Sequence, residues 1–158
     1  FIKMALPDAE EYNVRMCPEI HKPTLLKSKM VDEYVEFIEK ENTKYFGINV
    51  DFGVFATDPI PMWEGQEQRP EMLKFSEVED IVPLLPYVYA CHAKFQNMSE
   101  EFIETTTPYD KVIGILVEHN WDGYLLSEYE GPNKDVTGYV SDQLRRQHIM
   151  MKRLLGEN

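Results

Sequence analysis

The chain has 158 residues, 43% of them hydrophobic, and a formal net charge of −12, a composition typical of one soluble globular domain with a sizeable core. It contains neither the roughly 20-residue apolar run of a membrane span nor a recognisable secretion signal. An acidic balance of this size repels phosphate backbones and disfavours nucleic-acid partners.

The two cysteines, Cys17 and Cys91, are too few for a disulfide framework or a cysteine zinc site. Each stands in an apolar, strand-like run, so we expect both to be small buried strand residues. This cysteine usage indicates a reducing compartment, and we therefore expect the protein to be cytoplasmic.

Short apolar runs alternate with longer amphipathic stretches, which predicts strand-then-helix units around a parallel α/β sheet. In chain order the pattern predicts a strand over residues 14–20, a helix over 24–41, a strand over 46–50, a helix over 76–85, a strand over 87–94, a helix over 108–119, a strand over 124–128 and a helix over 136–155. Residues 1–13 are expected to be the end of a preceding helix and a connector. The whole chain, 1–158, is interpreted as a single domain of four units.

Local residues mark several of these boundaries. Ser76 with Glu79 three residues later is a capping-box pattern, and Pro86 predicts the end of the same helix. Pro108 suits the first turn of the third helix. The long proline-containing loop over 59–70 is of a length that commonly carries function or forms a lid. The last helix is expected to bury an apolar stripe of Val140, Leu144, Ile149 or Met150, Met151 and Leu154.

Each predicted strand finishes in a residue that can bind a metal: Glu19, Asp51, His92 and Glu128. Ligands of parallel α/β folds bind beyond the carboxyl ends of the strands, so these positions are expected to meet at one mouth. Three carboxylates and an imidazole in a partly dry pocket repel one another unless a cation is present. Ligation by oxygen with a single His suits Mn²⁺, Mg²⁺ or Co²⁺, and we expect Mn²⁺.

Strand side chains alternate, so the residue two positions beyond each ligand is expected on the same face. These residues are His21, Gly53, Lys94 and Glu130. His21 is the candidate proton-transfer group, because an unperturbed imidazole has a pKa of about 6.5; the alternative is a structural His bonded to backbone. Lys94 is a candidate contact to an anionic or hydroxylated substrate, and Glu130 a candidate second base or hydrogen-bond acceptor.

Aromatic residues flank the long loop. Trp63, with Phe52 and Phe55, is expected to wall a sugar-binding pocket by stacking, or else to pack in the core or in a lid.

The ordered quartet resembles that of the sugar phosphate isomerase and epimerase superfamily, which has the xylose-isomerase-like (β/α)8 TIM barrel. The resemblance covers essentially the whole chain but only the C-terminal half of such a barrel, its last four strand-helix units. The segment PYDKVIGILVEHNWDGYLLSEYEG, followed by the helix QLRRQHIMMKRLL, is similar to the closing segment of the family. The resemblance implies that Glu19, Asp51, His92 and Glu128 bind a divalent metal.

The resemblance also implies roles in catalysis. In the ketose epimerases of the superfamily the two metal-binding glutamates exchange protons with the substrate carbon, which implies Glu19 and Glu128 here. Those epimerases often have a further His three residues after the Asp, where this chain has Val54. The segments EIH and SEYEG are closer to a branch that includes catalytic subunits of bacterial C-glycoside deglycosidases. There a His near the first metal-binding Glu removes a proton from a 3-oxo sugar, a role that the resemblance gives to His21.

The sequence thus predicts a metal-dependent isomerase or epimerase that removes a proton α to a carbonyl of a carbohydrate. A lyase-type deglycosidase subunit that begins with the same proton removal is the alternative. Two rivals are an abasic-site endonuclease, which the negative charge argues against, and a noncatalytic barrel scaffold.

A closed barrel needs eight strands and about 250 residues. Four units leave two sheet edges unpaired and half of the interior uncovered. We therefore expect the remaining strands to come from an N-terminal half or a partner subunit, with dimerised half barrels as a third option. The expected partners are a carbohydrate substrate and other copies or subunits in an oligomer, with no nucleic acid and no membrane.

Overall fold

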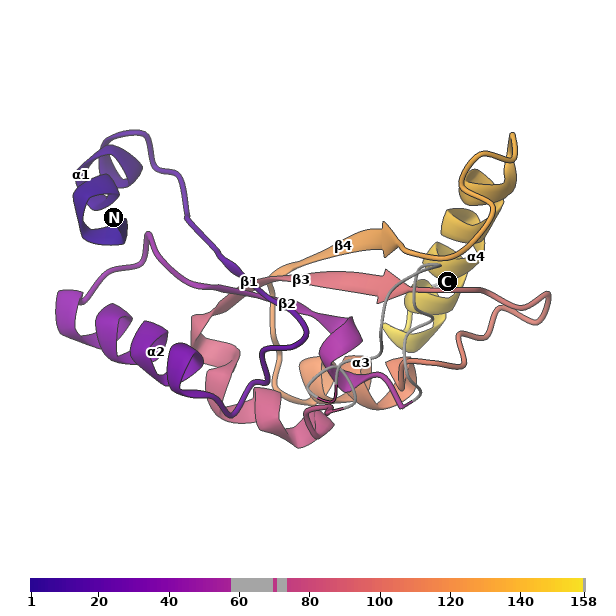
Figure 1. Ribbon diagram of the computed structural model, residues 1–158, viewed down its shortest axis with the longest axis horizontal. Helices are drawn as coiled ribbons and strands as arrows, with labels where there is room; N and C mark the ends of the chain where they lie inside the picture. Colours follow the sequence, from indigo (N-terminus) through magenta and orange to yellow (C-terminus); the bar gives the residue numbers. More distant parts are fainter. Residues whose placement is uncertain (58–69, 71–73, 158) are drawn as a thin grey trace.

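The computed structural model describes residues 1–57, 70 and 74–157. Trp63 and most of the long loop that contains it lie outside the described residues. The protein is an α/β structure with a four-stranded parallel sheet in the order β1-β2-β3-β4 (Figure 1). The strands are β1 Glu19–Ile20, β2 Ile48–Asp51, β3 Val88–Phe95 and β4 Tyr124–Tyr129. This confirms the parallel α/β class and the chain order of the four strands.

The register of the strands decides which side chains meet. Asp51 pairs with His92, and Lys94 pairs with Glu128. Residues directly opposite in parallel strands share a face, and every second residue returns to it. Asp51, His92, Lys94 and Glu128 therefore stand on one face of the sheet, near the carboxyl ends of the strands.

Helices cover the other face. The described α-helices are α1 Ile2–Glu11, α2 Lys29–Glu41, α3 Tyr109–Glu118 and α4 Tyr139–Leu154, and the described 3-10 helices are η1 Phe52–Phe55 and η3 Val78–Tyr87. The helices α2, η3, α3 and α4 contact one another in that order, and α4 packs on β4. Figure 1 shows α2, η3 and α3 on the same side of the sheet. None of the described helices is both long and apolar enough to cross a membrane.

The core lies between this helical layer and the sheet, because the strands alternate apolar and polar side chains. Buried strand and helix residues in it include Ile20, Ile48, Val50, Cys91, Ala93, Phe95, Ile113 and Leu116. Phe52 and Phe55 are buried in the same core, so the core-packing alternative is confirmed for this aromatic pair.

The first unit departs from its predicted limits. The strand predicted over 14–20 is reduced to Glu19–Ile20, with an isolated bridge between Met16 and Phe46. Pro18 has no N–H to donate, which interrupts the ladder at that point. The helix predicted over 24–41 begins at Lys29, because the preceding segment turns and the N–H of Leu26 donates to Ser76 Oγ at 3.0 Å.

The second helix is also different. Ser76 is engaged with Leu26, so the cap moves one residue along the chain: the N–H of Glu77 donates to Asp80 Oδ2 at 3.3 Å. The element is a 3-10 helix over Val78–Tyr87 that contains both Pro83 and Pro86, so Pro86 does not mark its end. Two prolines remove two donors that a continuous α-helix needs.

The last two helices fall close to prediction. The helix predicted over 108–119 is α3, with Pro108 and His119 as its flanking residues. The helix predicted over 136–155 is the shorter α4. Its most buried residues are Gln143, Gln147, Met150 and Met151, whereas Val140, Leu144 and Leu154 are half-buried at the edge of the core. Two polar side chains therefore occupy part of the stripe that was expected to be apolar.

Candidate metal centre

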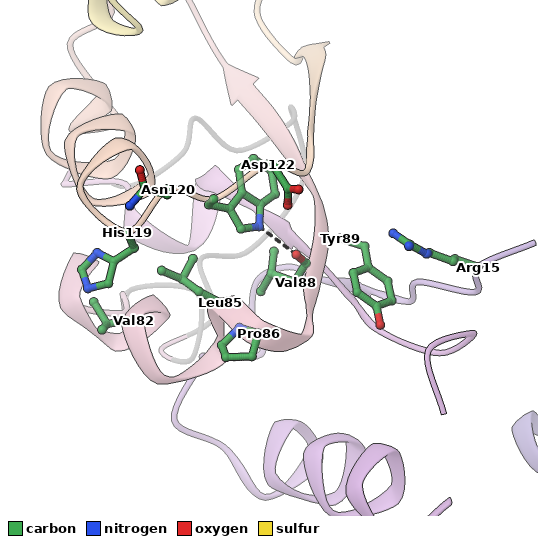
Figure 2. A pocket seen from close by; sticks show the side chains of 10 residues that line it. Arg15, Val82, Leu85, Pro86, Val88, Tyr89, His119, Asn120 and Asp122 are labelled. Carbon is green, nitrogen blue, oxygen red and sulfur yellow. Dashed lines mark hydrogen bonds between the residues drawn. The ribbon is translucent and has the colours of Figure 1, made fainter. Parts of the chain in front are cut away.

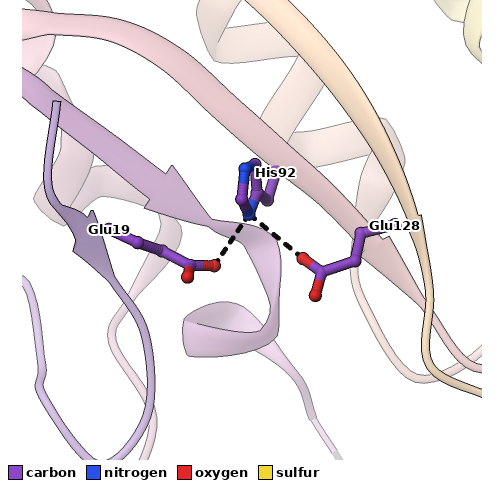
Figure 3. Close-up of side chains that lie close together, drawn as sticks. All are labelled: Glu19, His92 and Glu128. Atoms are coloured by element: carbon purple, nitrogen blue, oxygen red, sulfur yellow. Dashed lines mark hydrogen bonds and ion pairs between the residues drawn. The ribbon is translucent and has the colours of Figure 1, made fainter. Parts of the chain in front are cut away.

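Three of the four predicted ligands lie together at the carboxyl ends of their strands (Figure 3). His92 Nδ1 is 2.8 Å from Glu19 Oε1 and 3.2 Å from Glu128 Oε2. All three ligand atoms lie within 4.8 Å of one another. The residues come from β1, β3 and β4, and each side chain is about one third exposed (32%, 29% and 31%). The fold thus gathers distant residues into a cluster that is open on one side.

Asp51 lies beside this cluster rather than in it. Its side chain is almost fully buried, and Oδ1 accepts a hydrogen bond from the N–H of Gly53 at 2.7 Å. Its other oxygen, Oδ2, is 2.5 Å from Lys94 Nζ, which is also 3.5 Å from Glu128 Oε1. Lys94 therefore links Asp51 to the cluster, and the role of Asp51 as a fourth ligand stays a prediction.

The Gly53 position is tight. A Cβ there would lie 3.1 Å from Asp51 Oδ1 and 3.4 Å from Lys94 Cδ. The absence of a side chain at Gly53 lets its backbone approach the carboxylate closely and hold it against Lys94.

Burial sets the protonation preferences of the centre. It raises the pKa of Asp51, although the hydrogen bond and charge of Lys94 act in the opposite direction. Burial likewise raises the pKa of Glu128, against the attraction of Lys94. For Lys94, burial lowers the pKa, but the hydrogen bond and charge of Asp51, with the charges of Glu128 and Glu130, outweigh it and the pKa is raised. Both carboxyl groups thus carry a desolvation cost that Lys94 does not fully offset.

One carboxylate oxygen receives no hydrogen bond from the described part of the chain that would offset that cost, although His92 Nδ1 lies 3.2 Å from it. Among the described residues, Glu128 Oε2 is buried and receives no hydrogen bond. A buried charged oxygen without a donor is costly, and a cation bound at this oxygen would remove the cost.

The separations within the cluster fit such an ion. Ligand atoms about 2.1 Å from an octahedral metal lie ~3 Å from their neighbours. The two separations around His92 Nδ1, 2.8 and 3.2 Å, bracket that value. Two carboxylates and one imidazole also form a donor set that suits Mn²⁺ or a similar divalent ion. The residues present therefore fit the predicted metal.

His21 follows β1 and is exposed. Its Nδ1 is 2.7 Å from the backbone oxygen of Lys22. A carbonyl oxygen only accepts, so Nδ1 is the donor and the neutral ring keeps its lone pair on Nε2. His21 is thus bonded to the backbone through Nδ1, as one alternative predicted, and its Nε2 can still accept a proton. The role of His21 as a base stays a prediction.

Glu130 lies just after β4, with Oε1 3.7 Å from Lys134 Nζ. Its backbone N–H donates to the oxygen of Phe95 at 2.9 Å, which continues the pairing of the two strands beyond their assigned ends. Substrate contact by Glu130 and Lys94 stays a prediction, and Trp63 falls outside the described residues.

Sequence reasoning missed the support beneath this centre. Gln147 of α4 and Tyr109 of α3 bond to the backbone of β3 next to Lys94. The available indication was a pair of glutamines, Gln143 and Gln147, four residues apart in the buried stripe of an amphipathic helix. Polar residues at that spacing suggest a specific hydrogen-bonding task.

A cavity of about 490 Å³ lies near the amino ends of β3 and β4 (Figure 2). Tyr89 and Trp121 line it, with Arg15 stacked 4.6 Å from the centre of the Tyr89 ring. The indole N–H of Trp121 donates to the oxygen of Val88 at 2.8 Å. None of the predicted site residues that the structure describes lines this cavity, so it is separate from the cluster of Glu19, His92 and Glu128.

No profile of a known family matches the chain. Over 96% of its length the chain is 22% identical to a Microbacterium protein named 3'-dehydrocarminate deglycosidase alpha subunit. Over 99% of its length it is 21% identical to the C-glycoside deglycosidase alpha subunit of Arthrobacter globiformis. The matches span 60% and 59% of the length of these two proteins. The chain is thus distantly similar to alpha subunits of deglycosidases and covers somewhat more than half of their length.

Proposed function

We propose that this chain contributes the metal-binding part of a lyase-type deglycosidase subunit that removes a proton α to the carbonyl of a 3-oxo sugar. The observation that carries the proposal is the convergence of Glu19, His92 and Glu128 at the strand ends. The distant similarity to two deglycosidase alpha subunits supports this lyase chemistry over the isomerase and epimerase alternatives.

Glu19, His92 and Glu128 would hold the divalent ion, for which Mn²⁺ is our first choice. Asp51 is the proposed fourth ligand, and joining the set would require its Oδ2 to exchange Lys94 for the ion. A bound ion supplies polarisation of a substrate carbonyl or hydroxyl, which makes the neighbouring C–H more acidic.

Residues of the chain accept the proton and contact the sugar. His21 receives the proton from the carbon next to the carbonyl on its Nε2, which the bond from Nδ1 to the backbone leaves basic. The electron pair of that C–H bond forms a carbon–carbon double bond while the bond to the aglycone breaks. The aglycone carbon takes up a proton, so the elimination is redox-neutral. Lys94 and Glu130 are the proposed hydrogen-bonding contacts to the sugar.

We further propose that the four units complete a TIM barrel with strands outside this chain. The described sheet has two edges, β1 and β4, and the two relatives are longer than the matched region. A preceding segment or a partner subunit would supply the remaining strands. The name "alpha subunit" of both relatives makes a partner subunit a natural source.

The metal is tested first. The purified protein is loaded with Mn²⁺, freed of excess ion and assayed for bound metal, beside the variants Glu128→Gln and Asp51→Asn. We expect bound Mn²⁺ in the wild type and a loss of at least tenfold in affinity for Glu128→Gln, because its buried oxygen would no longer carry charge. Glu118→Gln, at the end of α3, is the matched control and should bind like the wild type.

The reaction is tested with a 3-oxo C-glycoside deuterated at the carbon next to the carbonyl. Mn²⁺-dependent loss of deuterium together with release of the aglycone supports the proposal. Loss of deuterium with an isomeric or epimeric sugar as product supports the isomerase or epimerase alternative. A wild type that binds no Mn²⁺ contradicts the metal proposal and favours a noncatalytic scaffold. Activity that survives in His21→Ala with metal still bound excludes His21 as the base.

A further inference from the structure

The residue near the centre of α4, Gln147, has a fully buried amide side chain. Gln147 is 0% exposed and packs beneath the carboxyl end of β3. Its Nε2 donates to the backbone oxygen of Ala93 at 2.6 Å and to the hydroxyl of Tyr109 at 2.7 Å. The Tyr109 hydroxyl in turn is 3.0 Å from the backbone oxygen of Lys94 and donates to it. The chain of bonds thus reaches two consecutive carbonyls of one strand.

The Lys94 carbonyl lies on the side of β3 that no neighbouring strand of the described structure covers. The pairing of β2 with β3 ends at Asp51 and His92, whereas β4 continues beside β3 to Phe95. Beyond His92, β3 therefore has a strand on one side only. On that open side the Tyr109 hydroxyl of α3 donates to the Lys94 oxygen, and Gln147 Nε2 of α4 donates both to this hydroxyl and to the Ala93 oxygen.

Packing alone does not explain a glutamine at this position. Among the described residues, Gln147 Oε1 is buried and has no hydrogen-bond partner. An unpaired buried oxygen is unfavourable, and an apolar side chain of similar volume avoids that cost. The Nε2 group of Gln147, which donates two hydrogen bonds, therefore accounts for a glutamine at this position.

The held backbone carries a side chain of the candidate centre. From the opposite face of β3, Lys94 Nζ reaches Asp51 Oδ2 at 2.5 Å and Glu128 Oε1 at 3.5 Å. A shift of the Lys94 backbone would move this ammonium relative to both carboxylates. Groups that hydrogen-bond to metal ligands commonly change metal affinity by 10–100-fold when they are removed, and Gln147 and Tyr109 act on such a group, Lys94, through its backbone.

We propose that Gln147 and Tyr109 are positioning residues of the metal centre, acting through the backbone of β3 at Lys94. This inference rests on the metal binding proposed above. The two residues touch neither the ion nor the substrate, and their bonds fix where the charged groups of Asp51, Lys94 and Glu128 stand.

The test compares Mn²⁺ affinity in Gln147→Met and Tyr109→Phe, measured by titration calorimetry, with the melting temperature of the metal-free proteins. Tyr109→Phe removes a single hydroxyl and keeps the ring, so it stays informative if Gln147→Met folds poorly. We expect about a tenfold loss of Mn²⁺ affinity or more in each. The double variant should lose little beyond the larger single loss, because both residues belong to one chain of bonds.

Gln143→Met is the matched control. Gln143 is also buried in α4, at 3% exposed, and its Oε1 accepts a hydrogen bond from the N–H of Met98 at 2.6 Å, a residue that follows β3. This variant should keep the Mn²⁺ affinity of the wild type within about twofold, even if its melting temperature falls as much as those of Gln147→Met and Tyr109→Phe. The electron paramagnetic resonance line shape of bound Mn²⁺ should change in the two test variants and not in the control.

The outcomes separate the two proposals. A wild type that binds no Mn²⁺ overturns the proposed function and this inference with it. A wild type that binds, with both test variants equal to it, overturns the inference alone. Equal weakening in the Gln143→Met control also overturns it, since the effect then reflects general destabilisation.

Discussion

At the scale of single residues, two buried or half-buried lysines have pKa values that are shifted in opposite directions. Lys94 is half-buried between carboxylates, and its charge is retained because Asp51 and Glu128 surround it. Lys22 is buried beside the ring of Phe75, with Nζ 3.1 Å from the ring centre. Burial lowers the pKa of Lys22 to about 8. The neighbours of Lys94 thus raise its pKa, whereas burial lowers the pKa of Lys22.

This difference predicts a pH effect. The folded-state pKa of Lys22, about 8, lies below its ordinary value of 10.5, so between these values the unfolded chain binds the proton that the folded chain has released. Stability attributable to Lys22 therefore rises with pH across that window. We expect the unfolding free energy of the wild type to gain about 1–3 kcal/mol relative to Lys22→Met between pH 8 and 10.5.

Urea denaturation at several pH values measures this difference. Lys29→Met is the control, since Lys29 forms an exposed helical pair with Glu33, and its difference from the wild type should change little with pH over the same range. A flat difference for Lys22→Met would contradict the lowered pKa.

At the scale of elements, two glycines have opposite roles. Gly131 follows β4, and a Cβ there would lie 1.8 Å from the backbone oxygen of Gln96. Gly114 is inside α3, where an added Cβ meets no heavy atom within 4 Å. The first allows the chain to pass close to the end of β3 beside the candidate centre. The second only lowers the helix propensity of α3.

Alanine at these positions should therefore have effects of opposite sign. We expect Gly131→Ala to lower the unfolding free energy by about 2 kcal/mol, because backbone must move to admit the methyl group. Gly114→Ala should raise it by about 0.5–1 kcal/mol. Denaturant unfolding of the two variants beside the wild type tests both, and a stabilising Gly131→Ala would show that the two segments are not closely packed.

Local patterns predicted elements whose limits depend on neighbours in sequence. The limits of α3 follow from Pro108 and the turn after His119, and both of these features are next to the helix in the sequence. The same reasoning predicted that Glu19, Asp51, His92 and Glu128 would meet, because the alternation of strand side chains and the parallel order fix their face; three of the four lie together, and Asp51 lies beside them. It placed the start of α2 too early, since the bond from Leu26 to Ser76 joins segments 50 residues apart.

The remaining differences at the centre have the same origin. The pairing of Asp51 with Lys94 depends on how far β3 extends beyond β2, and the support by Gln147 depends on how α4 crosses the sheet. Neither the extension of β3 beyond β2 nor the crossing of α4 over the sheet is encoded in a short pattern of residue types. Such contacts require the packed layers to be known.

At the scale of the whole molecule, the sheet ends in a strand that is apolar on its uncovered face. Tyr124 and Leu126 of β4 are 71% and 48% exposed, and they share the face of the sheet that carries Glu128. An edge strand with exposed apolar side chains is a template for pairing with another chain. This surface fits the proposed continuation of the barrel beyond the present chain.

The edge therefore predicts self-association when the chain is studied by itself. We expect its apparent mass in sedimentation velocity to rise with concentration, and the double substitution Tyr124→Lys with Leu126→Lys to shift it towards that of a single chain, because lysines on an edge oppose strand pairing. Tyr12→Lys is the control, since Tyr12 is also 71% exposed but lies after α1, away from the edge strand. The lysines should change the unfolding free energy little, since both side chains are already largely in solvent. A single-chain mass at every concentration, or association that the lysines leave unaltered, would show that β4 is not the contact.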